Sequence, residues 1–216
     1  MRQIPLPASQ LKKAKKSFWL KQLHTWHWTS SAISLIGLLL FAVTGITLNH
    51  AGEIEGKPVV EQREERLPEA LLPLVQPPAE SGEPAQASLP AELAAWVEDT
   101  FKVRAGGPAE WSADEIYLAL PQPGGDGWVA IDRLSGDVQA EITDRGWISY
   151  LNDLHKGRNS GTVWKWFIDI FAVACVIFAI TGLLLLKLHA AKRPSTWPLV
   201  ALGLVIPALL AILFIH

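Results

Sequence analysis

The histidines of this 216-residue chain stand at the edges of long apolar runs, a position that suggests metal or haem chemistry. Imidazole ligates metals, carries protons and caps haem iron near neutral pH. A histidine is costly at the centre of a bilayer and useful at its edge. The run "TWHWTSSAISLIGLLLFAVTGITLNH" over residues 25–50 is closed by histidine on both sides. The six histidines are His24, His27, His50, His155, His189 and His216.

Three apolar blocks must position these histidines. They cover residues 28–48, roughly 164–186 and 197–215, and the first block contains no charged residue. Because about 20 apolar residues suffice to cross a bilayer, each block is predicted to be a transmembrane helix. The third block is shorter and carries Pro207, which a membrane helix tolerates.

The charge distribution predicts an orientation in the membrane. Residues 1–27 hold six bases and no acid, and residues 187–193 add three bases. Residues 51–160 hold 20 acids and 9 bases, a net charge of −11. The positive-inside rule therefore predicts a multi-pass protein of the bacterial inner membrane with a cytoplasmic N-terminus and a periplasmic segment 51–160. A cleaved signal peptide is the competing interpretation, but the apolar run is too long for one.

The segment between the first two apolar blocks predicts a small α+β domain. The stretch "SLPAELAAWVEDTF" has helical spacing, with Ser88 as the expected cap. Next, short apolar runs alternate with the turn signals "PGGDG" and "SGD", which predicts an antiparallel sheet of two or three strands. The predicted order is a basic arm (1–27), helix (28–50), Pro/Glu-rich linker (51–87), α+β domain (88–150), loop and second helix (151–190), loop and third helix (191–216).

Several of these segments resemble a known family. The stretch "VAIDRLSGDV" resembles the turn of the PepSY module, Asp-x-x-(Thr/Ser)-Gly-(Glu/Asp). The flanking segments "HTWHW…TGITLNH" and "DLHKGRNSGTVWKWFIDI…TGLLLLKLH" resemble the PepSY-associated transmembrane helix family, in which both helices end in Thr-Gly. The resemblance covers about residues 28–58 and 88–190. It implies a membrane protein with a small extracytoplasmic PepSY-like α+β domain, and a haem protein that reduces ferric iron or ferric siderophores. With the third apolar block added, the predicted fold is membrane all-α with three transmembrane helices and that α+β domain.

The histidine spacing fits haem ligation between the first two helices. Two facing helices that each offer an imidazole can supply both axial ligands of a haem iron. The expected pairings are His50 with His155 at the outer edge, and His27 or His24 with His189 at the inner edge. His24 and His27 lie about one turn apart on the same helix, so both stay open as ligands. Because the two edges are ~35 Å apart along a straight helix, either one or two b-type haems are expected.

Three more residues belong to this hypothesis. Asp169 lies inside the second apolar block, where a carboxyl is expensive unless it is paired or functional. It is expected to orient a ligating histidine or carry protons, with helix contact beside Lys165 as the alternative. Lys156 and Arg158 directly follow a predicted ligand and could bind haem propionates, or serve only as interfacial bases. The terminal His216 is expected to be a bystander.

Together with the activity that the family resemblance implies, these features predict a haem b-binding inner-membrane oxidoreductase. It would take electrons from a quinol or another membrane donor and reduce periplasmic ferric iron or a ferric chelate for iron uptake. No nucleotide, flavin or nicotinamide fingerprint is present, and no nucleic-acid partner is expected. A homodimer is plausible because three helices are few for enclosing a porphyrin. The alternatives are a non-enzymatic PepSY-type accessory protein that binds a transporter, protease or metal ion, and an anchor subunit of a respiratory complex.

Overall fold

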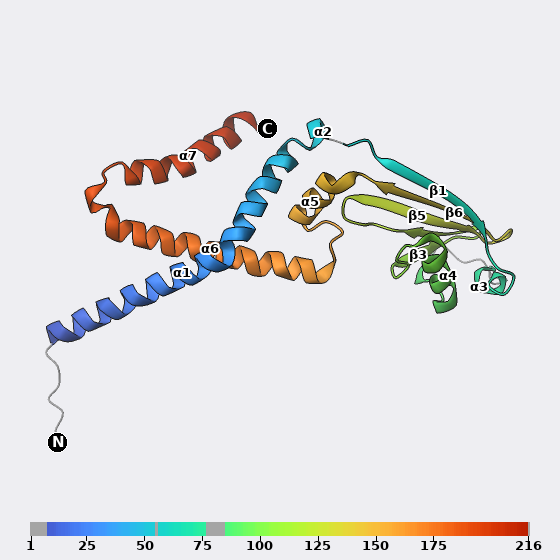
Figure 1. Cartoon of the computed structure of the whole chain (residues 1–216), viewed down its shortest axis with the longest axis horizontal. Coiled ribbons are helices and arrows are strands. Elements are labelled where there is room, and N and C mark those ends of the chain that lie inside the picture. The colour runs from blue at the N-terminus through green and yellow to red at the C-terminus, as the bar shows by residue number, and fades with distance from the viewer. Residues whose placement is uncertain (1–7, 55, 77–84, 216) are drawn as a thin grey trace, which may run out of the picture. The chain divides into compact units, whose positions relative to one another are not determined.

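The structure is a computed structural model that describes residues 8–54, 56–76 and 85–215. The chain divides into two compact units. The helical unit comprises Met1–Leu39 and Asp169–His216, and the sheet unit comprises Leu40–Ile168. Figure 1 shows the elements of both units in chain order.

Three of the described helices are long and apolar enough to cross a membrane. They are α1 (Ala8–Asn49), α6 (Gly161–His189) and α7 (Thr196–Phe214), of which α7 contains Pro207. The chain is therefore a multi-pass membrane protein. α1 begins well before the predicted position 28, so the basic arm expected over 1–27 is helical from Ala8 onward. The reason is composition, because residues 8–36 contain no glycine or proline and many strong helix formers.

Within the helical unit, α1 and α6 run antiparallel and pack through small residues. Gly37 of α1 lies against the buried ring of Phe171 on α6, where a Cβ atom would overlap the aromatic carbons. Ser30 and Ser34 are also buried, and their hydroxyls donate to carbonyls four residues earlier in α1. Small side chains of this kind allow two membrane helices to approach closely.

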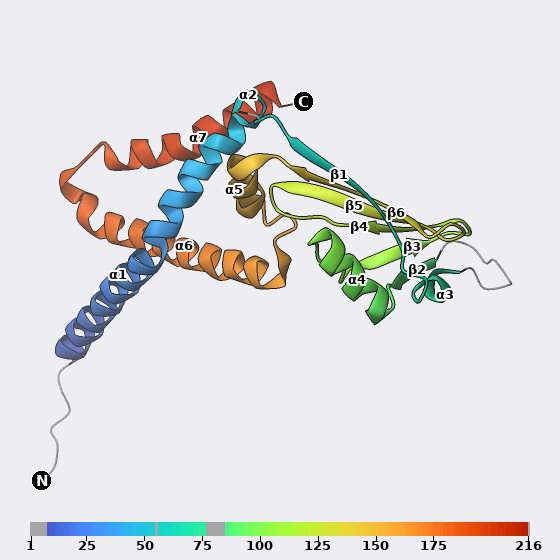
Figure 2. The same ribbon diagram turned by 45° about the vertical axis from the view of Figure 1, so that its right-hand side comes forward.

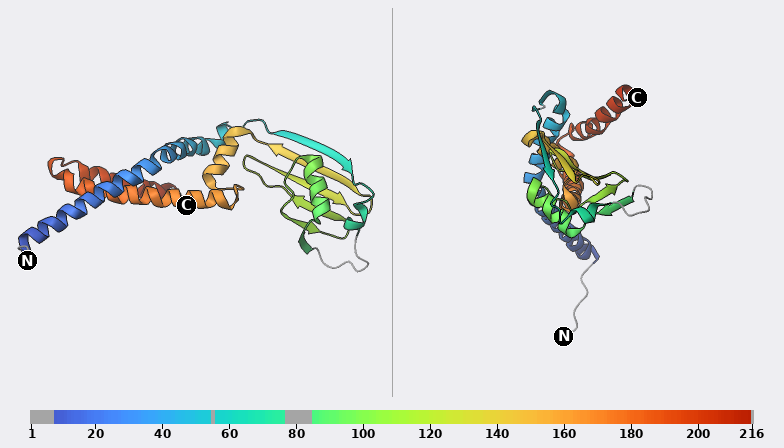
Figure 3. Two further views of the ribbon diagram at one scale, coloured as in Figure 1. Left: turned by 60° about the horizontal axis from the view of Figure 1, so that its bottom comes forward. Right: turned by 90° about the vertical axis from the view of Figure 1, so that its right-hand side faces the viewer.

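In the described part of the sheet unit, six antiparallel strands form one sheet in the order β1-β6-β5-β4-β3-β2. The helix α4 (Ala91–Phe101) covers one face of this sheet (Figures 2 and 3). The strands are β1 (Val59–Arg66), β2 (Ala85–Ser88), β3 (Pro108–Trp111), β4 (Glu115–Ala119), β5 (Gly125–Asp132) and β6 (Asp137–Asp144). The shorter helices are α2 (Ala51–Ile54), α3 (Leu72–Val75) and α5 (Gly146–Lys156), with a 3-10 turn at Ala190–Lys192.

The hydrophobic core of the sheet unit lies between α4 and the covered face of the sheet. Leu93, Val97 and Phe101 recur every four residues, so they share the face of α4 that is turned inward. Each central strand alternates buried and exposed residues, which is typical of a sheet with one solvated face. The buried strand residues are Ala109, Ile116, Leu118, Val129, Ile131, Val138 and Ala140.

The sheet is larger than the sequence predicted, because the described chain contributes six strands instead of two or three. The segment 51–87, predicted to be a linker, provides β1 and most of β2, while its residues 77–84 lie outside the described chain. β1 pairs with β6 from Val59↔Asp144 to Arg66↔Asp137, yet all its side chains are exposed. An edge strand with no buried face shows no apolar alternation, so its sequence resembles a charged linker. Ser88 lies in β2, so it does not cap α4.

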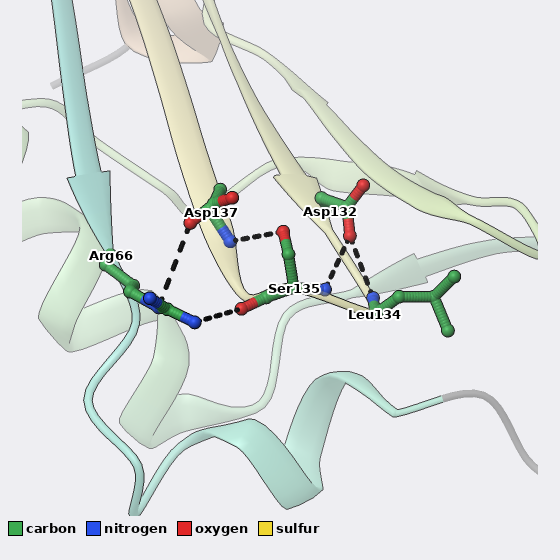
Figure 4. A network of polar contacts seen from close by, with 5 residues as sticks. All are labelled: Arg66, Asp132, Leu134, Ser135 and Asp137. Atoms are coloured by element: carbon green, nitrogen blue, oxygen red, sulfur yellow. Dashed lines mark hydrogen bonds and ion pairs between the residues drawn. The ribbon is translucent and has the colours of Figure 1, made fainter.

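The predicted Asp-Arg-Leu-Ser-Gly-Asp turn is present between β5 and β6 (Figure 4). The Asp132 carboxylate accepts hydrogen bonds from the backbone N–H of Ser135 at 2.7 Å and of Leu134 at 2.9 Å. These donors favour the ionised form and lower the pKa of Asp132 below its usual value of 3.8. Arg66 of β1 reaches the same turn, with its Nε 3.8 Å from the Asp137 carboxylate.

We expect this turn to make the stability of the sheet unit depend on pH. Because the pKa of Asp132 is lower in the folded than in the unfolded chain, its contribution is present above the unfolded pKa and is lost as pH falls through the folded pKa. The difference in unfolding temperature between the wild type and Asp132→Asn should shrink as the pH falls through the usual carboxyl pKa of 3.8 and then through the lower pKa of the folded chain. Circular dichroism melts of the full chain in micelles measure it. A difference that stays constant over this range would contradict the prediction.

Candidate functional site

His27 of α1 is half-buried against α6 within the helical unit. Its Nδ1 lies 3.0 Å from the Oγ1 of Thr181, and its ring stacks on Phe178 with centroids 4.9 Å apart and planes 16° apart. A Cβ atom built on Gly182 would lie 3.3 Å from the His27 Cε1, so the missing side chain makes room for the imidazole. We call Phe178, Thr181 and Gly182 the α6 seat.

His155 of α5 has a closely similar environment within the sheet unit. Its Nδ1 lies 2.7 Å from the Oγ1 of Thr44, and its ring lies beside Phe41 with centroids 4.9 Å apart and planes 43° apart. A Cβ atom on Gly45 would be 3.7 Å from the His155 Cε1. We call Phe41, Thr44 and Gly45 the α1 seat.

His24 and His189 face one another in the helical unit. Their ring centroids are 6.3 Å apart with planes at 84°. Each Nδ1 lies close to the carbonyl oxygen four residues earlier in its helix, at 2.9 Å for His24 and 2.8 Å for His189. Nε2 is therefore the nitrogen left for a ligand in both rings. Two imidazoles that bind one metal at about 2.0–2.1 Å on opposite sides have centroids about 6.4 Å apart, close to the spacing observed here.

The predicted outer pair is not in contact. The Nδ1 of His50 lies 3.2 Å from a carboxylate oxygen of Glu53, and both side chains are exposed. No hydrogen bond or ring contact joins His50 to His155 in the described chain. His155 lies instead against Phe41–Gly45 of α1, more than one helical turn before His50 in the chain. Of the two predicted pairings, the structure brings together the inner one, through His24. His216 lies outside the described residues.

The supporting residues are exposed and make few contacts. Asp169 lies on the surface of α6, and within the described residues no ion pair or hydrogen bond links it to Lys165 or to a histidine. Lys156 and Arg158 are exposed at the end of α5, where their charges are free of ion pairs with other described residues. Their predicted roles stay predictions.

The polar residues that hold α5 were not predicted from the sequence. Asn152 and Asp153 are buried directly before the Leu-His pair. Thr47 of α1 donates its hydroxyl to the Asn152 side chain at 2.8 Å, and the backbone N–H of Gly124 donates to the Asp153 carboxylate at 2.9 Å. These bonds hold α5 to α1 and to the loop before β5, which positions His155. The signal in the sequence was two adjacent polar residues, "ND", in front of the predicted ligand.

The roles of the residues in the two seats were not predicted either. The signal in the sequence is an internal repeat, "FAVTG" at 41–45 and "FAITG" at 178–182, whose Thr-Gly ends are the part that resembles the family. The phenylalanine, threonine and glycine of each copy are the residues that contact a histidine.

The two seat glycines should respond differently to alanine. A Cβ on Gly45 has ordinary contact at 3.7 Å, so Gly45→Ala should gain about 0.5–1 kcal/mol of helix stability. A Cβ on Gly182 at 3.3 Å must displace the His27 ring by a few tenths of an ångström, and this clash should cost about 1 kcal/mol, which offsets the gain in helix stability. Melts in micelles, together with the imidazole NMR shifts, measure both effects. Stability changes of the same sign and size would contradict the seat geometry.

Comparison with known protein families gives a match over most of the chain. The family model described as PepSY_TM-like matches residues 18–216, which include nearly all of the described elements. No match was found among curated proteins or among solved structures.

Proposed function

Because the chain belongs to the PepSY_TM-like family of membrane-associated PepSY proteins, we propose that it binds haem b and carries electrons across the inner membrane. In this proposal the acceptor is ferric iron or a ferric chelate in the periplasm, and the donor is a quinol or another membrane reductant. The bases before the apolar part of α1 and after α6 support an orientation with the His24–His189 pair on the cytoplasmic side.

The observation that carries the proposal is the facing pair of imidazoles, His24 and His189. Both have Nδ1 occupied by a helix carbonyl and Nε2 available. Two protein ligands suffice for haem iron, because the porphyrin supplies the other four. A bare zinc site ordinarily needs three or four protein ligands. Over residues 8–54, 56–76 and 85–215, no group of three or more His, Cys, Asp or Glu side chains comes together. The residues thus fit haem better than a bare ion.

The remaining histidines extend the proposal. His27 lies one turn from His24 and offers the inner haem an alternative ligand. His155 offers one imidazole on the outer side, and His155 of a second copy would complete the axial pair in a homodimer. Lys156 and Arg158 supply positive charge for propionates beside it. A bound haem would supply one-electron Fe(III)/Fe(II) chemistry, while the chain would supply ligation and position.

The test is the colour and haem content of the full chain purified from bacterial membranes in detergent. We expect a Soret band that sharpens on reduction with dithionite, one or two haems per chain, and reoxidation of the reduced protein by ferric citrate. His50→Ala, which removes an exposed histidine outside the pair and the seats, should keep the spectrum. A colourless protein that also fails to bind added hemin would refute the proposal and leave the accessory role.

A further inference from the structure

The two seats are copies of one sequence element in the two halves of the chain. Residues 41–48, "FAVTGITL", and 178–185, "FAITGLLL", are identical at five of eight positions. In both copies the ring centroids of phenylalanine and histidine are 4.9 Å apart, and the threonine hydroxyl meets Nδ1. Each histidine lies in the seat formed by the other copy. His27 precedes the first copy in the chain and lies in the α6 seat, whereas His155 precedes the second copy and lies in the α1 seat.

Each threonine hydroxyl lies between a helix carbonyl and the Nδ1 of the seated ring. A hydroxyl has one hydrogen to donate. Thr44 is 2.9 Å from the carbonyl oxygen of Leu40, and Thr181 is 2.7 Å from that of Ile177, the usual back-bond of a helical threonine. With its hydrogen donated to the helix, the hydroxyl oxygen can only accept. Nδ1 must then be the donor, which leaves Nε2 with a free lone pair.

We propose that Thr44 and Thr181 are positioning residues that hold His155 and His27 in the Nδ1–H tautomer. The chain then has two equivalent sites at which the lone pair of Nε2 is free to bind a metal. One site lies in each unit, and each is made by one copy of the repeat. This tautomer requires that the hydroxyl hydrogen goes to the helix carbonyl, as the back-bonds of 2.9 Å and 2.7 Å favour. The identification of the ligand as haem iron rests on the proposed function.

The tautomers can be measured without haem. The full chain, labelled with ¹⁵N-histidine and prepared haem-free in micelles near pH 8, should show His27 and His155 as Nδ1–H tautomers. His27→Gln and His155→Gln assign the signals. In Thr181→Val, only His27 should lose this signature, and in Thr44→Val only His155. Thr44→Ser and Thr181→Ser should retain this signature. The matched control is Thr25→Val, because the hydroxyl of Thr25 donates to the Lys21 carbonyl and not to a histidine. Unchanged tautomers in both valine variants would overturn the inference.

Hemin titration of the same proteins tests the link to the ligand. Loss of a partner that orients a ligating imidazole typically weakens metal binding 10–100-fold, so the valine variants should lose affinity by about this factor and the serine variants should not. If the tautomers change while hemin affinity does not, the seats are not ligand sites. If even the wild type binds no hemin while the tautomers behave as expected, the proposed function fails and the positioning role stands.

Discussion

The His189→Ala variant is expected to lose the spectrum of bis-imidazole haem and most of its haem. His189 is the α6 imidazole that faces His24 of α1, and His27 lies one turn further along α1. Removing only an orienting partner of a metal ligand costs about 10–100-fold in affinity, so removing the ligand should cost at least as much. The haem-to-protein ratio from a pyridine haemochrome assay measures the effect.

The two α1 histidines make this prediction sharper. His24→Ala should lose less haem than His189→Ala, because His27 lies one turn away on the same helix. The double variant His24→Ala/His27→Ala should match His189→Ala. Equal and full haem content in all these variants would show that the inner ligands lie elsewhere.

The Phe101→Ala variant is expected to destabilise the sheet unit far more than the truncation of an exposed apolar side chain does. The Phe101 side chain is 1% exposed, belongs to the core between α4 and the sheet, and meets Trp96 edge-on with ring centroids 5.9 Å apart. Removing a buried phenylalanine typically costs about 3–5 kcal/mol. A small domain has about 5–15 kcal/mol in total, so this unit should approach unfolding near physiological temperature.

Tryptophan fluorescence during urea unfolding of the full chain in micelles measures this loss. The matched control is Leu134→Ala, which truncates an apolar side chain that is 77% exposed at the turn after β5. Its effect should stay within about 0.5 kcal/mol. Equal effects of the two variants would contradict the proposed core.

The elements that the sequence predicted are those with a strong periodic signal. α6 and α7 are long and mostly apolar, and α4 repeats apolar residues every four positions. β1 was not predicted, because five of its eight residues are charged and neither face is buried. Its strand conformation comes from pairing with β6, a contact between residues 71 to 85 positions apart in the chain. No local pattern in "VVEQREER" encodes such a contact.

The candidate site was predictable in its residue types and only partly in its contacts. The positions of the histidines at the ends of apolar runs were visible in the sequence. Which of His24 and His27 faces His189 depends on how α1 is rotated against α6, and the two side chains differ by only about 60° around the helix. The contact of His155 with Thr44 depends on α5, which lies in a segment predicted to be a loop. The FAxTG repeat, which is visible in the sequence alone, could have indicated both seats.

The pairing of β1 with β6 has a mechanical consequence. β1 follows the end of α1, and β6 leads through α5 to the start of α6. The two connections to the helices therefore join the β1–β6 ladder at the same end, beside the Val59–Asp144 pair. Antiparallel hydrogen bonds lie perpendicular to the strands. Tension that drew the two helix ends apart would therefore load these bonds one pair at a time and unzip the ladder toward Arg66, at far lower force than shearing. Strand β5, on the other side of β6, would keep its pairing until the ladder had opened.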